Sequence, residues 1–171
     1  LWSFRKGVAP SALSISLDGK FAGVGHKGGL FLLNNAGSLT WATKKIRRVR
    51  DISISTRTGR MSIASGQKVV YLIDRKGAVI WHRELQSSAV STSISSNGNV
   101  IVVGTNLGRL VVFNGKGKML WETHLSNSDF PVNSVDISSD GKFIVAGTDY
   151  SHIYLHDIKG NILWAKETTG V

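Results

Sequence analysis

The chain has 171 residues, of which 42% are hydrophobic and 19% charged, enough for one domain with a buried core. It contains no cysteine, which excludes disulfides, thiolate metal sites and cysteine nucleophiles, and no apolar run approaches the roughly 20 residues that cross a bilayer. The net charge of +10 is uneven: residues 1–124 carry 18 Lys and Arg against 5 Asp and Glu, whereas residues 125–171 carry 3 against 6. The positive charge of residues 1–124 favours anionic partners.

Tryptophan recurs along the chain at positions 2, 41, 81, 121 and 164, with spacings of 39, 40, 40 and 43 residues. An Ile-Ser pair keeps the same period and precedes a turn glycine in every copy. These pairs and glycines are Ile15-Ser16 with Gly19, Ile54-Ser55 with Gly59, Ile94-Ser95 with Gly98, and Ile137-Ser138 with Gly141. A period of about 40 residues indicates a repeat architecture. We place four copies at approximately 3–43, 44–83, 84–123 and 124–166 of a single domain, 1–171.

Each copy predicts four short strands. The first holds the Ile-Ser pair and leads through a turn such as Asp-Gly or Asn-Gly, a strong hairpin signal because glycine tolerates positive φ. The second strands are Phe21–Val24, Met61–Ala64, Val100–Val103 and Phe143–Ala146. The third strands are Leu30–Leu33, Val70–Ile73, Leu110–Phe113 and Ile153–His156. A glycine-containing turn then leads to a fourth strand, which we expect to end at the tryptophan.

The pattern of the strands predicts an all-β fold. No window shows a helical period, and the middle strands are almost continuously apolar, so both faces of each small sheet are covered. Four-stranded antiparallel sheets repeated every 40 or so residues are the blades of a β-propeller, with about four blades in this chain. A sandwich or an up-and-down barrel would show one polar face and no strict period.

Two segments carry a family resemblance. The run from Ser138 to Gly147 looks like the core of a WD40-type blade, and Ser16 to Phe21 repeats its first half. A WD40 blade would close its third strand with Trp-Asp, where this chain has His156-Asp157. The runs Asp157–Trp164 and Asp74–Trp81 are instead similar to quinoprotein-like (PQQ-like) propeller repeats. The resemblance implies blade architecture and leaves function open, because such repeats host many unrelated roles.

Motifs that would indicate catalysis or a cofactor are weak. Residues 23–28 satisfy a dinucleotide-binding fingerprint, but a strand follows them where that site needs a helix, so we interpret them as a glycine-rich turn. His152 and His156 share a strand face roughly 13 Å apart, too far to share one ion. Quinoprotein enzymes need a complete ring, a calcium site and a catalytic Asp, and we find no acidic cluster to supply one. We therefore expect no metal, no cofactor and no enzymatic activity.

The basic run Lys44-Lys45-Ile46-Arg47-Arg48-Val49-Arg50 is the most unusual local feature. It joins the first copy to the second, and in a propeller such connections share one face with the turns between second and third strands. A solvated charge run and an anion-binding face are both open interpretations. Stacking of nucleic-acid bases needs aromatic rings among the cations, which this run lacks. The predicted partner-binding residues on this face are Lys27, Lys44, Lys45, Arg47, Arg48, Arg50, Lys68, Arg109 and Tyr150, with His26 beside them.

These features favour a non-catalytic β-propeller scaffold that binds a protein partner or an anionic surface. The alternative is a fragment of a PQQ-dependent quinoprotein dehydrogenase. Four narrow blades rarely close alone, and Leu1-Trp2 matches the end of a preceding blade. We therefore expect either a piece of a longer propeller or two chains that complete one eight-bladed ring. The three-residue insertion within residues 126–131 is a second place where specificity is expected.

Overall fold

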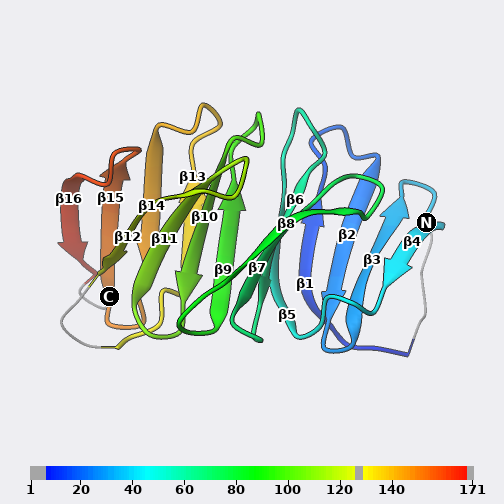
Figure 1. Ribbon diagram of the computed structural model, residues 1–171, viewed down its shortest axis with the longest axis horizontal. Helices are drawn as coiled ribbons and strands as arrows, with labels where there is room; N and C mark the ends of the chain where they lie inside the picture. The colour runs from blue at the N-terminus through cyan, green and yellow to red at the C-terminus, as the bar shows by residue number, and fades with distance from the viewer. Residues whose placement is uncertain (1–6, 126–128, 169–171) are drawn as a thin grey trace.

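The computed structural model describes residues 7–125 and 129–168. Its sixteen strands form four antiparallel sheets of four strands each, and the described residues contain no helix. Figure 1 shows the four sheets side by side in a single row. The structure confirms the all-β fold of propeller blades. None of the described segments is a helix of the length and apolarity that a membrane crossing requires.

The strands follow one another in space as they do in sequence. The first sheet consists of β1 (Pro10–Ile15), β2 (Phe21–His26), β3 (Gly29–Asn34) and β4 (Leu39–Thr43). The second consists of β5 (Val49–Ile54), β6 (Met61–Ser65), β7 (Val69–Ile73) and β8 (Val79–Glu84). The third consists of β9 (Ala89–Ile94), β10 (Val100–Thr105), β11 (Arg109–Asn114) and β12 (Met119–His124). The fourth consists of β13 (Ser134–Ile137), β14 (Phe143–Gly147), β15 (His152–Asp157) and β16 (Ile162–Glu167).

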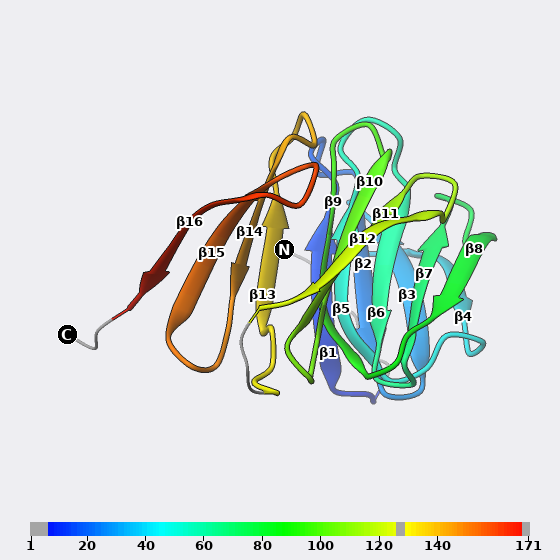
Figure 2. The same ribbon diagram turned by 60° about the vertical axis from the view of Figure 1, so that its left-hand side comes forward.

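The first strand of every sheet lies on the inside of the row, where β1, β5, β9 and β13 pack against one another in turn. Figure 2 shows these inner strands gathered together and β16 fanning outward at one end. Neighbouring inner strands are joined by polar side chains. The Asp51 carboxylate accepts a hydrogen bond from the Thr92 amide at 2.8 Å, and the Ser93 hydroxyl donates to Asp136 at 2.8 Å. Ser91 and Ser93 of β9 are buried at this joint, where their hydroxyls donate to the Val132 carbonyl and to Asp136.

Every fourth strand contains a β-bulge just before its tryptophan. In the first sheet Leu32 pairs with Trp41 and Leu33 pairs with Leu39, so Thr40 is the extra residue. The other three sheets repeat this shift. A bulge of this kind changes the direction in which the side chains of its strand point. The fourth strands continue beyond the tryptophan at which the sequence predicts their end, because the residues after it still pair with the third strand.

The tryptophans join each blade to the next through a hydrogen bond. Each indole Nε1–H donates to a backbone carbonyl in the turn between the third and fourth strands of the following blade. The pairs are Trp41 with Arg75 (2.9 Å), Trp81 with Gly115 (3.2 Å) and Trp121 with Ile158 (2.8 Å). In the last sheet Trp164 is 41% exposed, whereas Trp81 between two sheets is 7% exposed. The tryptophan is therefore a packing residue of the blade joint.

A turn glycine faces each of these tryptophan rings. A Cβ atom added to Gly77, Gly117 or Gly160 would lie 3.0, 2.9 or 3.1 Å from the ring that packs on it. All three glycines also have positive φ, of 85°, 78° and 92°. Two independent constraints, backbone conformation and close approach, thus require glycine at these positions.

Gly117→Ala is expected to destabilise the protein by about 2–4 kcal/mol, because it adds a steric clash with Trp81 to the cost of positive φ. Gly19→Ala is a matched control, since Gly19 has φ of 64° and nothing lies within 4 Å of an added Cβ. The Gly19→Ala variant should lose about 1 kcal/mol of unfolding free energy. Chemical denaturation of both variants measures the difference. Equal losses would contradict a role for the glycine in the joint.

Candidate anion-binding site

The predicted partner-binding face lies at the lower edge of the sheets in Figure 1, where the sheet-to-sheet connections meet the turns between second and third strands. Three segments are joined there by backbone hydrogen bonds. The Arg48 amide donates to the Lys27 carbonyl, and the Gly66 amide donates to the Arg48 carbonyl, each at 2.9 Å. The connection after β4 is thereby fixed between the turns of the first and second blades.

Two apolar residues anchor the basic connection. Ile46 and Val49 are each only 1% exposed and belong to the core between the first two blades. Val49 packs so closely on Gly25 that no side chain would fit there. The glycines of residues 23–28, which match the dinucleotide-binding fingerprint, thus belong to β2 and to the turn after it. This agrees with the glycine-rich turn predicted from the strand that follows them. Because the apolar residues point inward, the cations between them point toward solvent.

A hollow of about 870 Å³ lies over the joint between the first two blades. Five cations line it together with Gly28, Gly66 and Gln67, and the cations are Lys27, Lys44, Arg47, Arg48 and Lys68. We call this site the basic hollow. A smaller hollow of about 360 Å³ adjoins it and adds Arg50. Lys45 is exposed on the same connection without lining either hollow.

No carboxylate of the described residues neutralises the basic hollow. The ion pairs among the described residues are Lys20–Asp18, Arg109–Glu122, His124–Asp129 and Lys142–Asp140, and none contains a cation of the hollow. The lining that the structure describes contains no aspartate or glutamate either. Five like charges around one depression repel one another and attract anions.

Two cations of the hollow have strained backbones. Arg48 has φ of 49° and Lys68 has φ of 64°, in the left-handed region that ordinary residues rarely adopt. In the third blade the position of Lys68 is occupied by Gly108, with φ of 69°. The second blade therefore keeps a lysine where the backbone favours glycine. The fourth blade has Ser151 at the same position, with φ of 54°, so this turn is left-handed in three blades and Lys68 adds a charge to it.

Arg109 and Tyr150 lie outside the basic hollow. The Arg109 guanidinium is bound to Glu122 at 2.9 Å and lines a separate hollow of about 270 Å³ between the second and third blades. Tyr150 stacks on Phe130, with ring centroids 4.7 Å apart, and on His152 at 5.7 Å. The structure thus brings five of the nine predicted residues into one hollow and a sixth, Arg50, into the adjoining one. Residues 126–128 of the predicted insertion, and Leu1-Trp2, lie outside the described residues.

Tyr150 opens a stack of aromatic rings that runs along β15. The stack continues through His152 and Tyr154 to His156, whose ring lies 5.6 Å from that of Trp121. The alternation Tyr-x-His-x-Tyr-x-His over residues 150–156 is the signal for it, because alternate residues of a strand share a face. These histidines are packing residues. Among residues 7–125 and 129–168, no three His, Cys, Asp or Glu side chains gather into a group that could hold a metal ion.

His156 is fully buried at a position where the other blades have Leu33, Ile73 and Phe113. Its Nδ1 lies 3.3 Å from the Gly160 carbonyl oxygen, and its Nε2 has no partner. Burial lowers the pKa of the imidazole below 6.5, although the Gly160 carbonyl and the neighbouring Asp157 partly oppose this shift. The ring is therefore neutral in the folded protein at neutral pH.

Comparison with known proteins identifies the repeat. The family model described as outer membrane protein assembly factor BamB, a PQQ-like repeat model, matches residues 65–170. No curated protein matches the sequence. Among solved structures, hydrazine synthase of Kuenenia stuttgartiensis matches with a TM-score of 0.81 and 16% identity over 96% of this chain. The chain spans 51% of that chain, about half its length. At this identity the likeness shows the fold alone.

The buried His156 predicts that stability falls in mild acid. Below pH 6.5 the unfolded chain binds a proton at this site that the folded protein, with its lowered pKa, still excludes. Unfolding should therefore become easier as the pH falls below 6.5, by up to about 1.4 kcal/mol per unit. His156→Phe, which copies Phe113 of the third blade, should remove this part of the dependence in pH-resolved urea melts. An unchanged pH profile in that variant would contradict the assignment.

Proposed function

The chain belongs to the PQQ-like repeat family of β-propellers, and from that premise we propose that it is a non-catalytic scaffold that binds an anionic partner through the basic hollow. The partner is foremost an acidic protein surface. The observation that carries the proposal is the meeting of five cations, from two turns and one connection, without a carboxylate among them. The family description supports a binding role, since it names an assembly factor.

The energetics of the hollow support the same conclusion. A left-handed backbone costs a non-glycine residue roughly 1–2 kcal/mol, and the hollow contains two such residues, Arg48 and Lys68. Repulsion among the like charges adds to this cost. A surface that needed only solubility could place the same charges beside carboxylates and on relaxed backbone. The arrangement is suited instead to a ligand that brings the missing negative charge.

The shape and lining of the hollow favour acidic groups over nucleic acid. Among the residues that the structure describes, no aromatic side chain lines it, so nucleotide bases would find no ring there to stack on. The two arginines can hold carboxylates in a bidentate manner, and the three lysines add point charges. The hollow also spans the first blade joint, so one ligand can contact both blades.

Binding of polyglutamate, measured by fluorescence anisotropy, tests this function. The wild-type chain should bind it in a salt-dependent manner, because exposed charges are screened by salt. The double variant Arg47→Glu, Arg48→Glu should lose about tenfold or more in affinity. Arg109→Glu, outside the hollow, should change the affinity little. Unchanged binding by the double variant would favour the solvated-face interpretation.

Lys68→Gly is expected to stabilise the free protein while weakening its binding of polyglutamate. The substitution restores the glycine of the third blade, removes the backbone strain and reduces the repulsion, for a gain of about 0.5–1 kcal/mol. Lys76→Gly removes the same charge from a turn at the opposite edge. This control should not stabilise the protein and should leave binding intact. A loss of stability in Lys68→Gly would contradict the strain argument.

The two ends of the row support a second element of the proposal, closure of a larger ring. On β1, Leu13 and Ile15 are each 67% exposed, and Ile162 on β16 is 57% exposed. A second copy would bring the acidic last blade against the basic first blade, twice. Sedimentation then gives twice 18.5 kDa for the eight-bladed dimer. A monodisperse 18.5 kDa species would overturn the dimer and favour a longer propeller chain.

A spectroscopic measurement separates the scaffold from the quinoprotein alternative. Addition of PQQ and Ca²⁺ should produce no bound-cofactor absorbance if the chain is a non-catalytic scaffold. A stoichiometric shift of the cofactor spectrum would overturn that part of the proposal.

A further inference from the structure

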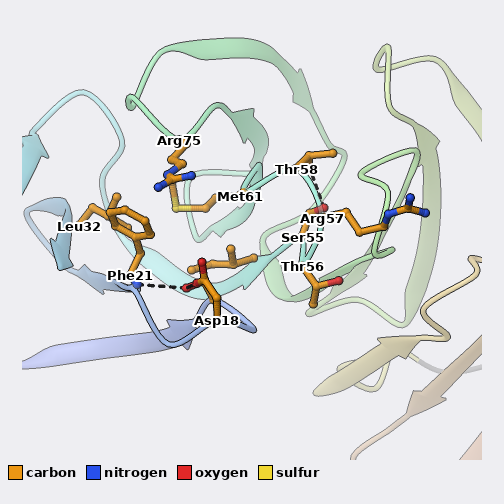
Figure 3. A pocket seen from close by; sticks show the side chains of 12 residues that line it. Asp18, Phe21, Leu32, Ser55, Thr56, Arg57, Thr58, Met61 and Arg75 are labelled. Atoms are coloured by element: carbon orange, nitrogen blue, oxygen red, sulfur yellow. Dashed lines mark hydrogen bonds between the residues drawn. The ribbon is translucent and has the colours of Figure 1, made fainter. Parts of the chain in front are cut away.

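Another cavity lies at the opposite edge of the sheets, again between the first and second blades (Figure 3). It has a volume of about 120 Å³, which corresponds to about four water molecules. Leu32, Ile54 and Met61 contribute its apolar lining, and Asp18 and Arg75 are among its charged residues. We call it the joint cavity. It shares no residue with the basic hollow.

One of the turns that line the joint cavity is longer than its counterparts. From Ser55 to Gly59 the turn has one residue more than in the other blades, and the Gly59 amide bonds the Ser55 carbonyl at 3.0 Å. This turn is held by the third blade, since the Ser55 hydroxyl and the Arg57 amide both donate to the Ser96 carbonyl, at 2.7 and 2.9 Å. Among the described residues, no hydrogen bond joins it to the corresponding turn of the first blade.

The Arg75 side chain lines this cavity, and its positive charge helps to lower the pKa of Asp18. Its Cζ lies 4.1 Å from the centroid of the Phe21 ring, a cation–π contact that holds the planar group in place. Within the described part of the chain, its side chain makes no ion pair or hydrogen bond. The equivalent positions of the third and fourth blades are Gly115 and Ile158, which offer no such group. Figure 3 shows Arg75 beside Phe21 and Leu32, while Arg57 extends away from it.

We propose that the joint cavity binds a carboxylate carried on a short aliphatic chain. The carboxylate pairs with the fork of Arg75, whose geometry suits two parallel hydrogen bonds. The aliphatic part lies over Leu32, Ile54 and Met61. The volume limits the buried part to about four to six non-hydrogen atoms. A free short-chain acid and the C-terminus of a polypeptide share this chemistry.

Asp18 at the rim limits the affinity for such an anion. Its carboxylate accepts hydrogen bonds from the Ser16 hydroxyl at 2.6 Å and the Lys20 amide at 3.1 Å, and these keep its pKa below the ordinary value. The group is therefore ionised and repels the ligand. In the third blade Asn97 fills the same turn position and makes the same two contacts, at 2.9 and 3.0 Å. Asp18→Asn thus removes the charge and keeps the turn.

Titration of the isotope-labelled chain with butyrate, followed by NMR, tests the proposal. Saturable shifts are expected at the Arg75 Nε–H and the Phe21 amide, and butylamine, which has a similar chain and the opposite charge, should cause none. Arg75→Ala should weaken butyrate binding about tenfold or more. Arg60→Ala, which removes a nearby charge outside the cavity, should bind as the wild type does. Asp18→Asn should bind several-fold more tightly.

The source of the carboxylate is resolved by a short peptide ending in valine. If the peptide binds with its free C-terminus and fails to bind as the amide, the natural ligand is a chain terminus. If only butyrate enters, the ligand is a free acid. Absence of saturable butyrate and peptide shifts, or wild-type binding by Arg75→Ala, would overturn the proposal. These outcomes are independent of polyglutamate binding at the basic hollow.

Discussion

Each joint between neighbouring blades depends on a tryptophan that lies against a glycine of the next blade and donates its indole hydrogen to a carbonyl two residues before that glycine. The bulge before the tryptophan directs the ring, and the positive φ of the glycine keeps the turn open beneath it. The spacing of the tryptophans therefore follows from the geometry of the joint. Because the joint is the same each time, the rest of each blade is free to vary in its turns and connections.

Both candidate sites lie at the first joint, and both arise where the copies differ. On one edge the connection after β4 is rich in cations and anchored by Ile46 and Val49. On the other edge a turn with one extra residue is bonded toward the third blade and away from the first. The same tryptophan joint holds the two blades together beneath both features. A scaffold of repeats can thus carry binding sites without disturbing the packing that builds it.

Much of this architecture can be predicted from the sequence. The periodic tryptophans and Ile-Ser pairs predict the blades, and the topology of a propeller places Lys27, the basic run and Lys68 on one edge. The ion pair between Arg109 and Glu122 could not be predicted, because it depends on the register of β11 and β12, which shifts at the bulge. Tyr150 stacks on Phe130, which precedes it by two strands, β13 and β14, and no local sequence pattern shows this contact. The longer turn is visible in the sequence, but its consequence depends on bonds to Ser96.

The central claim is that recognition occurs at the departures from the repeat, foremost at the basic hollow. Hydrogen–deuterium exchange with and without polyglutamate tests it most directly. The account predicts slower exchange in residues 44–50 and 66–68, with no change in the turns at the opposite edge, such as residues 138–143. Protection at that opposite edge, or the absence of any protection at the basic hollow, would contradict it.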